Sequence, residues 1–293
     1  MDRRAIALVA VGIALVAASA RAQSQQRVLA PTVFATRDLP ANAITTFTTT
    51  CRPGFVATSA GVTKRAAGAT LLAVVPVGAR AYRFRFGNPV TNDRQRVTVA
   101  VACRKIAGAA GAKYRLKLKP PKPAQVTAPA GKSAAASLAC PSGTVPAGAG
   151  ADLDPNRQKS AQAYRGGLRL SIRRETSTLS RFSFSVQNTG SQPRTVVFYG
   201  GCVTLARAPG APRERLHVEV TTFSVDVRPG SRAFTRRCRR GWFSLAAGFA
   251  LPGKLIQADG AAAVGSGGRW SVSSDAVAPA RANLQLVCAR LAP

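Results

Sequence analysis

A pattern of one cysteine and two glycines occurs three times in the chain, and its register never changes. Two residues separate the cysteine from the first glycine and six residues separate the first glycine from the second, starting at Cys51, Cys140 and Cys238. One match would mean little in a chain with 26 glycines, but three matches in register are hard to obtain by chance. Because a repeated pattern marks one structural unit per copy, we expect three related units.

The second half of each unit repeats as well. A short β-branched run ends on a second cysteine in each copy, at residues 96–103, 194–202 and 281–288. Upstream of these runs, apolar or aromatic residues alternate with polar ones at 82–86, 181–186 and 269–272. Alternation with a period of two, a polar turn and a β-branched run together predict a hairpin-like pair of strands.

Six cysteines would allow fifteen disulfide patterns. Metal binding needs cysteine and histidine at short spacing, whereas these cysteines lie tens of residues apart and the chain has one histidine. If each unit folds by itself, the pairs must lie within the units. The predicted disulfides are Cys51–Cys103, Cys140–Cys202 and Cys238–Cys288. Each would stabilise its unit by roughly 4 kcal/mol in the chain-entropy model.

The strand-like runs, frequent turns and lack of a long helical period predict an all-β protein made of three tandem small β-sandwiches. Turns rich in Pro, Ala and Gly are expected at 39–42, 128–131 and 227–230. Linkers of similar composition lie near 107–112 and 207–213. We therefore place the modules at residues 23–112, 113–212 and 213–293.

The first 22 residues have the order of a secretory signal peptide. A basic start is followed by an apolar run at 5–18 and by small residues at Ala20 and Ala22. This run is shorter than the roughly 20 residues that span a bilayer. We expect cleavage after Ala22 or after Ala20, no later membrane-spanning segment, and a secreted or extracytoplasmic protein.

The net charge of +31 predicts attraction to anionic surfaces. Removal of residues 1–22 takes away three Arg and one Asp, which leaves +29. Two clusters are candidate polyanion-binding sites: Lys113, Arg115, Lys117 and Lys119, and Arg236, Arg237, Arg239 and Arg240. The first would occupy one face of a strand; the alternative is an ordinary solvated face. Expected partners are anionic cell-envelope polymers or a membrane surface, and we do not expect nucleic acid in vivo.

Catalytic patterns are weak. The one histidine, His217, lies in an alternating run that predicts a half-exposed strand residue, and the cysteines are assigned to disulfides. Asp152 and Asp154 could bind calcium or form a turn. We predict a protein that is not an enzyme and has no cofactor and no metal. The alternative is a secreted hydrolase of an envelope polymer, which a concave site with convergent acids between the modules would favour.

The residues 140–143, Cys-Pro-Ser-Gly, and the run 195–202 resemble exported bacterial proteins, common in actinobacteria, that are built from modules opening with Cys-Pro-x-Gly. The first and third units depart from that pattern, since Arg52 and Arg239 stand where it has proline. The resemblance implies an exported module and supplies no active site. We therefore predict a non-enzymatic structural or binding protein of the bacterial envelope or exterior, attached weakly to anionic polymers by its basic surface.

Overall fold

The computed structural model describes residues 27–292 apart from 67, 108–112, 154, 156–167, 175–179, 212, 251–255 and 275–278. All regular elements in these residues are β-strands, so the all-β prediction is confirmed. No helix in the described part of the chain is long and apolar enough to span a membrane. The predicted signal peptide lies outside the described residues.

Residues 27–107, here called segment 1, form two sheets. Its strands are β1 (Arg27–Leu29), β2 (Thr32–Leu39), β3 (Ala43–Thr50), β4 (Val56–Arg65), β5 (Thr70–Val77), β6 (Ala81–Asn88) and β7 (Gln95–Ala107). In one sheet β7 pairs with β4 on one side and with both β1 and β2 on the other; in the second sheet β6 lies between β3 and β5. All these pairs are antiparallel.

Segment 2, residues 113–207, repeats this order with β14 and β13 as the central strands. Its strands are β8 (Tyr114–Leu118), β9 (Ala124–Ala128), β10 (Ser133–Ala139), β11 (Val145–Asp152), β12 (Leu168–Arg174), β13 (Arg181–Asn188) and β14 (Arg194–Arg207).

Segment 3, residues 213–292, repeats the order again around β20 and β19. Its strands are β15 (Arg215–Val227), β16 (Gly230–Arg237), β17 (Phe243–Ala250), β18 (Ile256–Val264), β19 (Gly267–Ser274) and β20 (Ala280–Ala292). One continuous strand, β15, replaces the two short strands that start the other segments. Pro31 and Pro120 interrupt those strands because proline has no N–H to donate.

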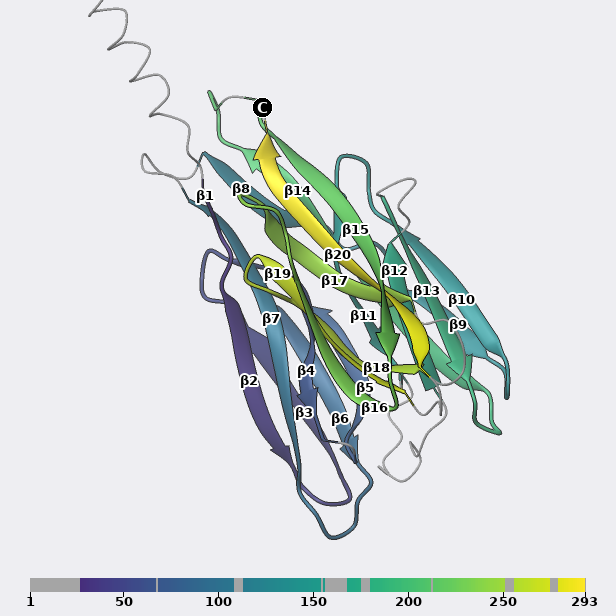
Figure 1. The fold of residues 1–293 in the computed structure, drawn as a ribbon. Coiled ribbons are helices and arrows are strands. Elements are labelled where there is room, and N and C mark those ends of the chain that lie inside the picture. The colour runs from purple at the N-terminus through teal and green to yellow at the C-terminus, as the bar shows by residue number, and fades with distance from the viewer. Residues whose placement is uncertain are drawn as a thin grey trace, which may run out of the picture.

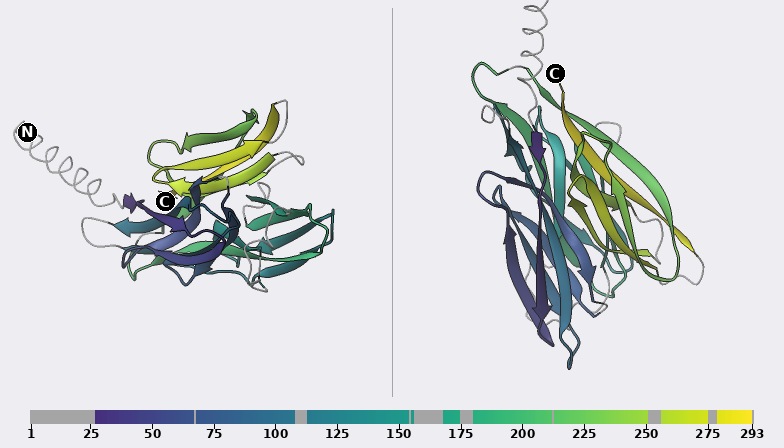
Figure 2. Two further views of the ribbon diagram at one scale, coloured as in Figure 1. Left: turned by 90° about the horizontal axis from the view of Figure 1, so that it is seen from below. Right: turned by 60° about the vertical axis from the view of Figure 1, so that its left-hand side comes forward.

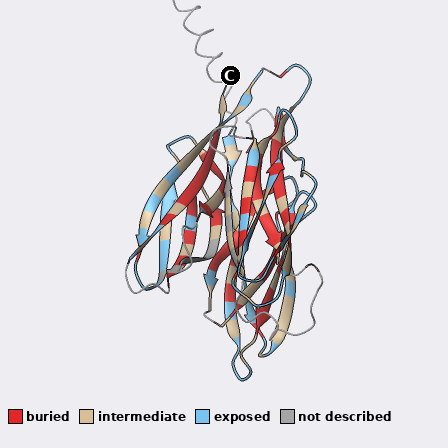
Figure 3. Ribbon diagram, turned by 90° about the vertical axis from the view of Figure 1, so that its right-hand side faces the viewer, coloured by how far each residue is buried: buried red, intermediate tan, exposed pale blue. Residues whose placement is uncertain are grey.

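The two sheets of each segment enclose a core that contains its disulfide. Residues 33–103, 124–202 and 223–288 each contribute one separate apolar cluster. The predicted pairs Cys51–Cys103, Cys140–Cys202 and Cys238–Cys288 are all present, each with Cα atoms 5.7 Å apart. Buried residues alternate with exposed ones along many strands, as Figure 3 shows.

The predicted hairpins are wrong. β6 and β7 do not pair with each other, because β6 belongs to the sheet of β3 and β5, whereas β7 pairs with β1, β2 and β4. Both are central strands that already have neighbours on each side. Their inward side chains, such as Phe84 and Val99, meet in one core. The chain between them therefore crosses from one sheet to the other, over a gap of about 10 Å.

A buried asparagine holds that crossing in two of the segments. The Asn88 Nδ2 donates to the backbone oxygens of Leu39, Pro40 and Asp93, at 3.1, 3.0 and 2.9 Å. Asn188 makes the equivalent bonds in segment 2, from its Nδ2 to Ala128 O at 2.9 Å and Gln192 O at 2.7 Å. These bonds tie the crossing to the predicted turns after β2 and β9.

The sheets continue from one segment into the next. The last strand of one sheet in segment 1, β5, pairs with β11 of segment 2, and β12 of segment 2 pairs with β17 of segment 3. The predicted boundaries fall between β7 and β8 and between β14 and β15, yet hydrogen-bonded sheets cross them. Independent folding of each module stays a prediction.

The second glycine of the repeated pattern lies at these joints. A Cβ on Gly150 would overlap with the carbonyl of Val74 on β5, and one on Gly248 would lie 3.0 Å from Ile172 O on β12. Gly61 has the same role against Ala261 O, which joins β4 to β18. Segment 3 therefore meets segment 1, and the three segments form a closed ring, seen from below in Figure 2.

The centre of the ring has an apolar core of its own. One cluster includes Ala30, Val203 and Leu245, from segments 1, 2 and 3 respectively. A second cluster includes Ile106 and Tyr114, again with partners from all three segments. The ring is thus stabilised by burial shared between segments as well as by the separate core of each segment.

Candidate polyanion-binding surface

The first predicted basic cluster lies on β8 and its flanks. Lys113, Arg115, Lys117 and Lys119 are all exposed, whereas the intervening Tyr114 and Leu116 are buried at the centre of the ring. β8 is an edge strand that pairs only with β14 among the described strands. The cations follow one face of the strand, as predicted, at a spacing of about 7 Å.

The second cluster surrounds the disulfide of segment 3. Arg236, Arg237, Arg239 and Arg240 are exposed at the end of β16 and in the turn that follows. Arg236 lies over the Phe223 ring, 5.6 Å from its centroid. The Arg239 Nη2 is 3.3 Å from the Glu219 carboxylate. Two of these four guanidinium groups therefore have a protein contact that orients them.

The structure does not bring the two clusters into one sheet. β8 belongs to the seven-stranded sheet of segments 1 and 2, and β16 belongs to a three-stranded sheet of segment 3. The two clusters are therefore separate basic surfaces, on strands of different sheets.

Two further cations occupy a repeated place that the sequence reasoning missed. Lys105 and Arg290 each lie two residues after the second cysteine of their segment. The Lys105 Nζ is 5.7 Å from the centroid of Phe55, and the Arg290 guanidinium is 5.1 Å from that of Trp242. Phe55 and Trp242 are equivalent positions in the repeat, so the alignment of the three units could have revealed both pairs.

Trp242 is half-buried, and besides Arg290 its ring also contacts the imidazole of His217. The two ring centroids are 5.4 Å apart and the planes are nearly perpendicular, at 83°. His217 lies opposite Arg290 in the ladder of β15 and β20. His217 is thus an exposed residue of β15 whose ring packs against Trp242.

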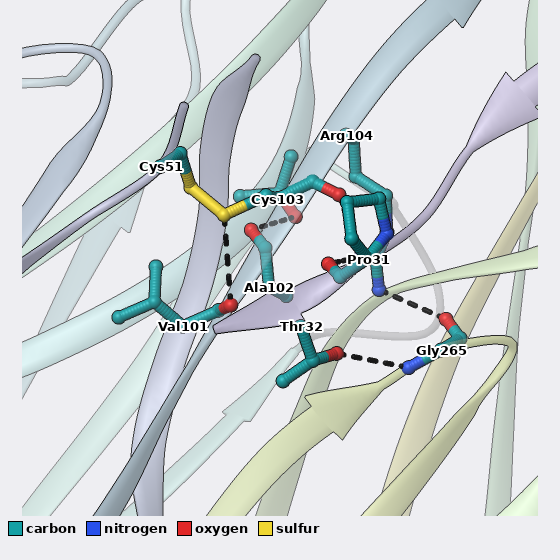
Figure 4. The surroundings of a disulfide bond; sticks show 9 residues. Pro31, Thr32, Cys51, Val101, Ala102, Cys103, Arg104 and Gly265 are labelled. Atoms are coloured by element: carbon teal, nitrogen blue, oxygen red, sulfur yellow. Dashed lines mark hydrogen bonds between the residues drawn. A yellow bond between two sulfur atoms is a disulfide. The ribbon is translucent and has the colours of Figure 1, made fainter. Parts of the chain in front are cut away.

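One cation, Arg104, is fully buried and donates only to oxygens of the protein. Arg104 donates from Nε to Ser244 O (2.7 Å), from Nη1 to Pro31 O and Cys103 O (3.1 and 3.0 Å), and from Nη2 to Ser244 Oγ and Gly265 O (both 3.0 Å). Figure 4 shows the bonds to Pro31 and Gly265 beside the disulfide. Burial lowers the pKa of this guanidinium to about 9, so it stays charged at neutral pH. It connects segment 1 to segment 3.

The remaining predicted site is the pair of aspartates. Asp152 lies at the end of β11, opposite Val197 in the ladder with β14, and Asp154 lies outside the described residues. Within the described ranges, no three His, Cys, Asp or Glu side chains are grouped as metal ligands would be.

No protein-family model matches the chain. No curated protein matches it either.

Proposed function

We propose that this is an exported, non-enzymatic protein that attaches to anionic polymers of a bacterial envelope or exterior through exposed basic side chains. Exposure of all eight predicted cations, from Lys113 before β8 to Arg240 beyond β16, is the observation that carries the proposal. The three disulfides are compatible with an oxidising compartment outside the cytoplasm.

Charge arithmetic supports attachment. The chain has 42 Lys and Arg but 11 Asp and Glu, so at least 31 cations cannot each have a carboxylate of their own. A polyanion would supply the missing negative charge and release its counterions, which makes binding strongly dependent on salt. The free energy of such binding comes from many weak contacts, because single surface ion pairs contribute at most about 1 kcal/mol.

The test is binding of the purified protein to polyphosphate and to polyglutamate, followed by fluorescence anisotropy at rising salt. We expect binding at about 50 mM salt that is lost by about 500 mM, where exposed charges are screened. One variant replaces the four cations on and beside β8 by Gln, and a second replaces the four arginines between Arg236 and Arg240 by Gln. We expect each variant to bind more weakly than the natural protein. Binding that persists at high salt would contradict an electrostatic attachment, and no binding at low salt would end the proposal.

A further inference from the structure

One end of the molecule carries at least two basic residues from each segment. This set, called the basic end, consists of Arg27, Lys105, Arg115, Lys117, Arg215 and Arg290. β7, β14 and β20 all finish here, and Figure 1 shows β1, β8 and the C-terminal end of β20 together at the top. All six are exposed except Lys105, which is half-buried.

The fold explains why these cations point outwards. Val28, Leu116 and Leu216 are packed in one apolar cluster at this end of the ring. Because successive side chains of a strand point to opposite faces, burial of these three turns their neighbours to solvent. Arg27, Arg115 and Arg215 are those neighbours, and each pairs with the alanine four residues after the second cysteine of its segment. They are therefore equivalent positions around the ring.

The opposite end of the molecule has a mixed charge. Asp38 and Asp226 lie there, near the ends of β2 and β15, and each is bound by an arginine of the neighbouring strand, at 2.7 and 3.7 Å. Asp93 lies in the crossing before β7. At the basic end Glu214 is partly buried, and burial raises the pKa of its carboxyl. Both ends thus carry exposed cations, but at the opposite end they are interspersed with the aspartates Asp38, Asp93 and Asp226.

We propose that the basic end docks end-on to the surface of an anionic phospholipid bilayer. The proposal rests on the electrostatic attachment above and names its surface and partner. Cations on three sides of one end suit a flat array of negative headgroups, whereas a linear polymer would meet one or two sides at a time. Leu29, 44% exposed, and the half-buried Trp242 lie beside these cations, and tryptophan favours the boundary between apolar and aqueous phases.

The test compares two triple variants by co-sedimentation with vesicles of phosphatidylglycerol and phosphatidylcholine. The first carries Arg27→Gln, Arg115→Gln and Arg215→Gln. The control carries Arg94→Gln, Lys132→Gln and Arg228→Gln, which removes the same charge from exposed positions at the opposite end. At about 1 kcal/mol per cation at an anionic surface, we expect the first triple to bind about 100-fold more weakly and the control to change about threefold at most.

Binding of the protein to polyphosphate in solution distinguishes a failure of this inference from a failure of the proposed function. Equal losses in the two triples would overturn the inference, because net charge alone would then explain binding. Binding of the natural protein to polyphosphate but not to anionic vesicles would overturn the lipid partner and leave polymer attachment standing. Failure to bind either would contradict both proposals. Urea midpoints of the two triples should match that of the natural protein, since the six side chains substituted in the two variants are all exposed.

Discussion

The ring has two joints between segments that follow one another in the chain and one joint between its two ends. At the first two, β5 pairs with β11 and β12 pairs with β17, so hydrogen-bonded sheets continue. At the third, β18 lies against β4, and side chains add to the contact: Arg104 bonds Ser244 and Gly265, over 140 and 161 residues of sequence. The closing joint therefore joins segments 1 and 3 partly through the hydrogen bonds of a buried side chain.

The comparison shows how a repeat can be adapted at one place. In segments 2 and 3 the residue after the second cysteine is apolar, Val203 and Ala289, and both lie in the central cluster. Segment 1 has Arg104 there instead. All five of its N–H groups have an oxygen partner, and two of the acceptors belong to Ser244. A buried charge without a carboxylate is tolerated when every donor is satisfied, and its five bonds specify which surfaces meet.

The largest expected effect comes from filling the glycine positions at the joints. Gly61→Val should destabilise the protein by about 3 kcal/mol or more, because the new side chain would collide with a backbone carbonyl that cannot move aside alone. Gly248→Val, where the Cβ would lie 3.0 Å from Ile172 O, should cost less. Urea unfolding followed by tryptophan fluorescence measures both. Equal midpoints for the two variants would show that the closing joint contributes no more than the others.

Arg104→Met should have the next largest effect, about 2–3 kcal/mol. It keeps the apolar volume but leaves buried oxygens of Ser244 and Gly265 with one donor fewer. The measurement is the free energy of urea unfolding at pH 7, where the guanidinium is charged. Arg104→Lys serves as the control: it keeps the charge but has three donors instead of five, so it should recover only part of the loss. Full recovery by lysine would mean that charge rather than bond geometry closes the ring.

Thr32→Val is expected to have the smallest effect, about 1 kcal/mol. The Thr32 Oγ1 accepts a hydrogen bond of 3.0 Å from Gly265 N, and valine has nearly the same shape without the acceptor. Thr36→Val is the matched control, since its hydroxyl bonds Thr98 on the exposed face of segment 1 and touches no joint. A larger loss for Thr36→Val than for Thr32→Val would contradict the importance of the closing joint.

Local patterns were enough to predict several features of the site. The alternation of lysine and arginine with apolar residues on β8 predicted the exposed face, and the structure has it. The repeat predicted the cysteine pairs. The hairpin between β6 and β7 was wrong, because alternation tells which face of a strand is apolar but not which strand lies beside it. The basic end was missed for the same reason: Arg27, Arg115 and Arg215 are almost 90 or more residues apart in the chain.

The sequence by itself determined the repeat, the all-β class, the disulfide partners and the excess of positive charge, because each of these depends on residue type and short-range spacing. Only the tertiary structure decided that Gly61, Gly150 and Gly248 hold three segments in a ring and that cations of all three segments meet at one end. Strand pairing between segments depends on contacts between residues that are far apart in the chain, and short-range patterns do not specify those contacts. A repeated glycine marks a close approach, but its partner is known only when the sheets are in place.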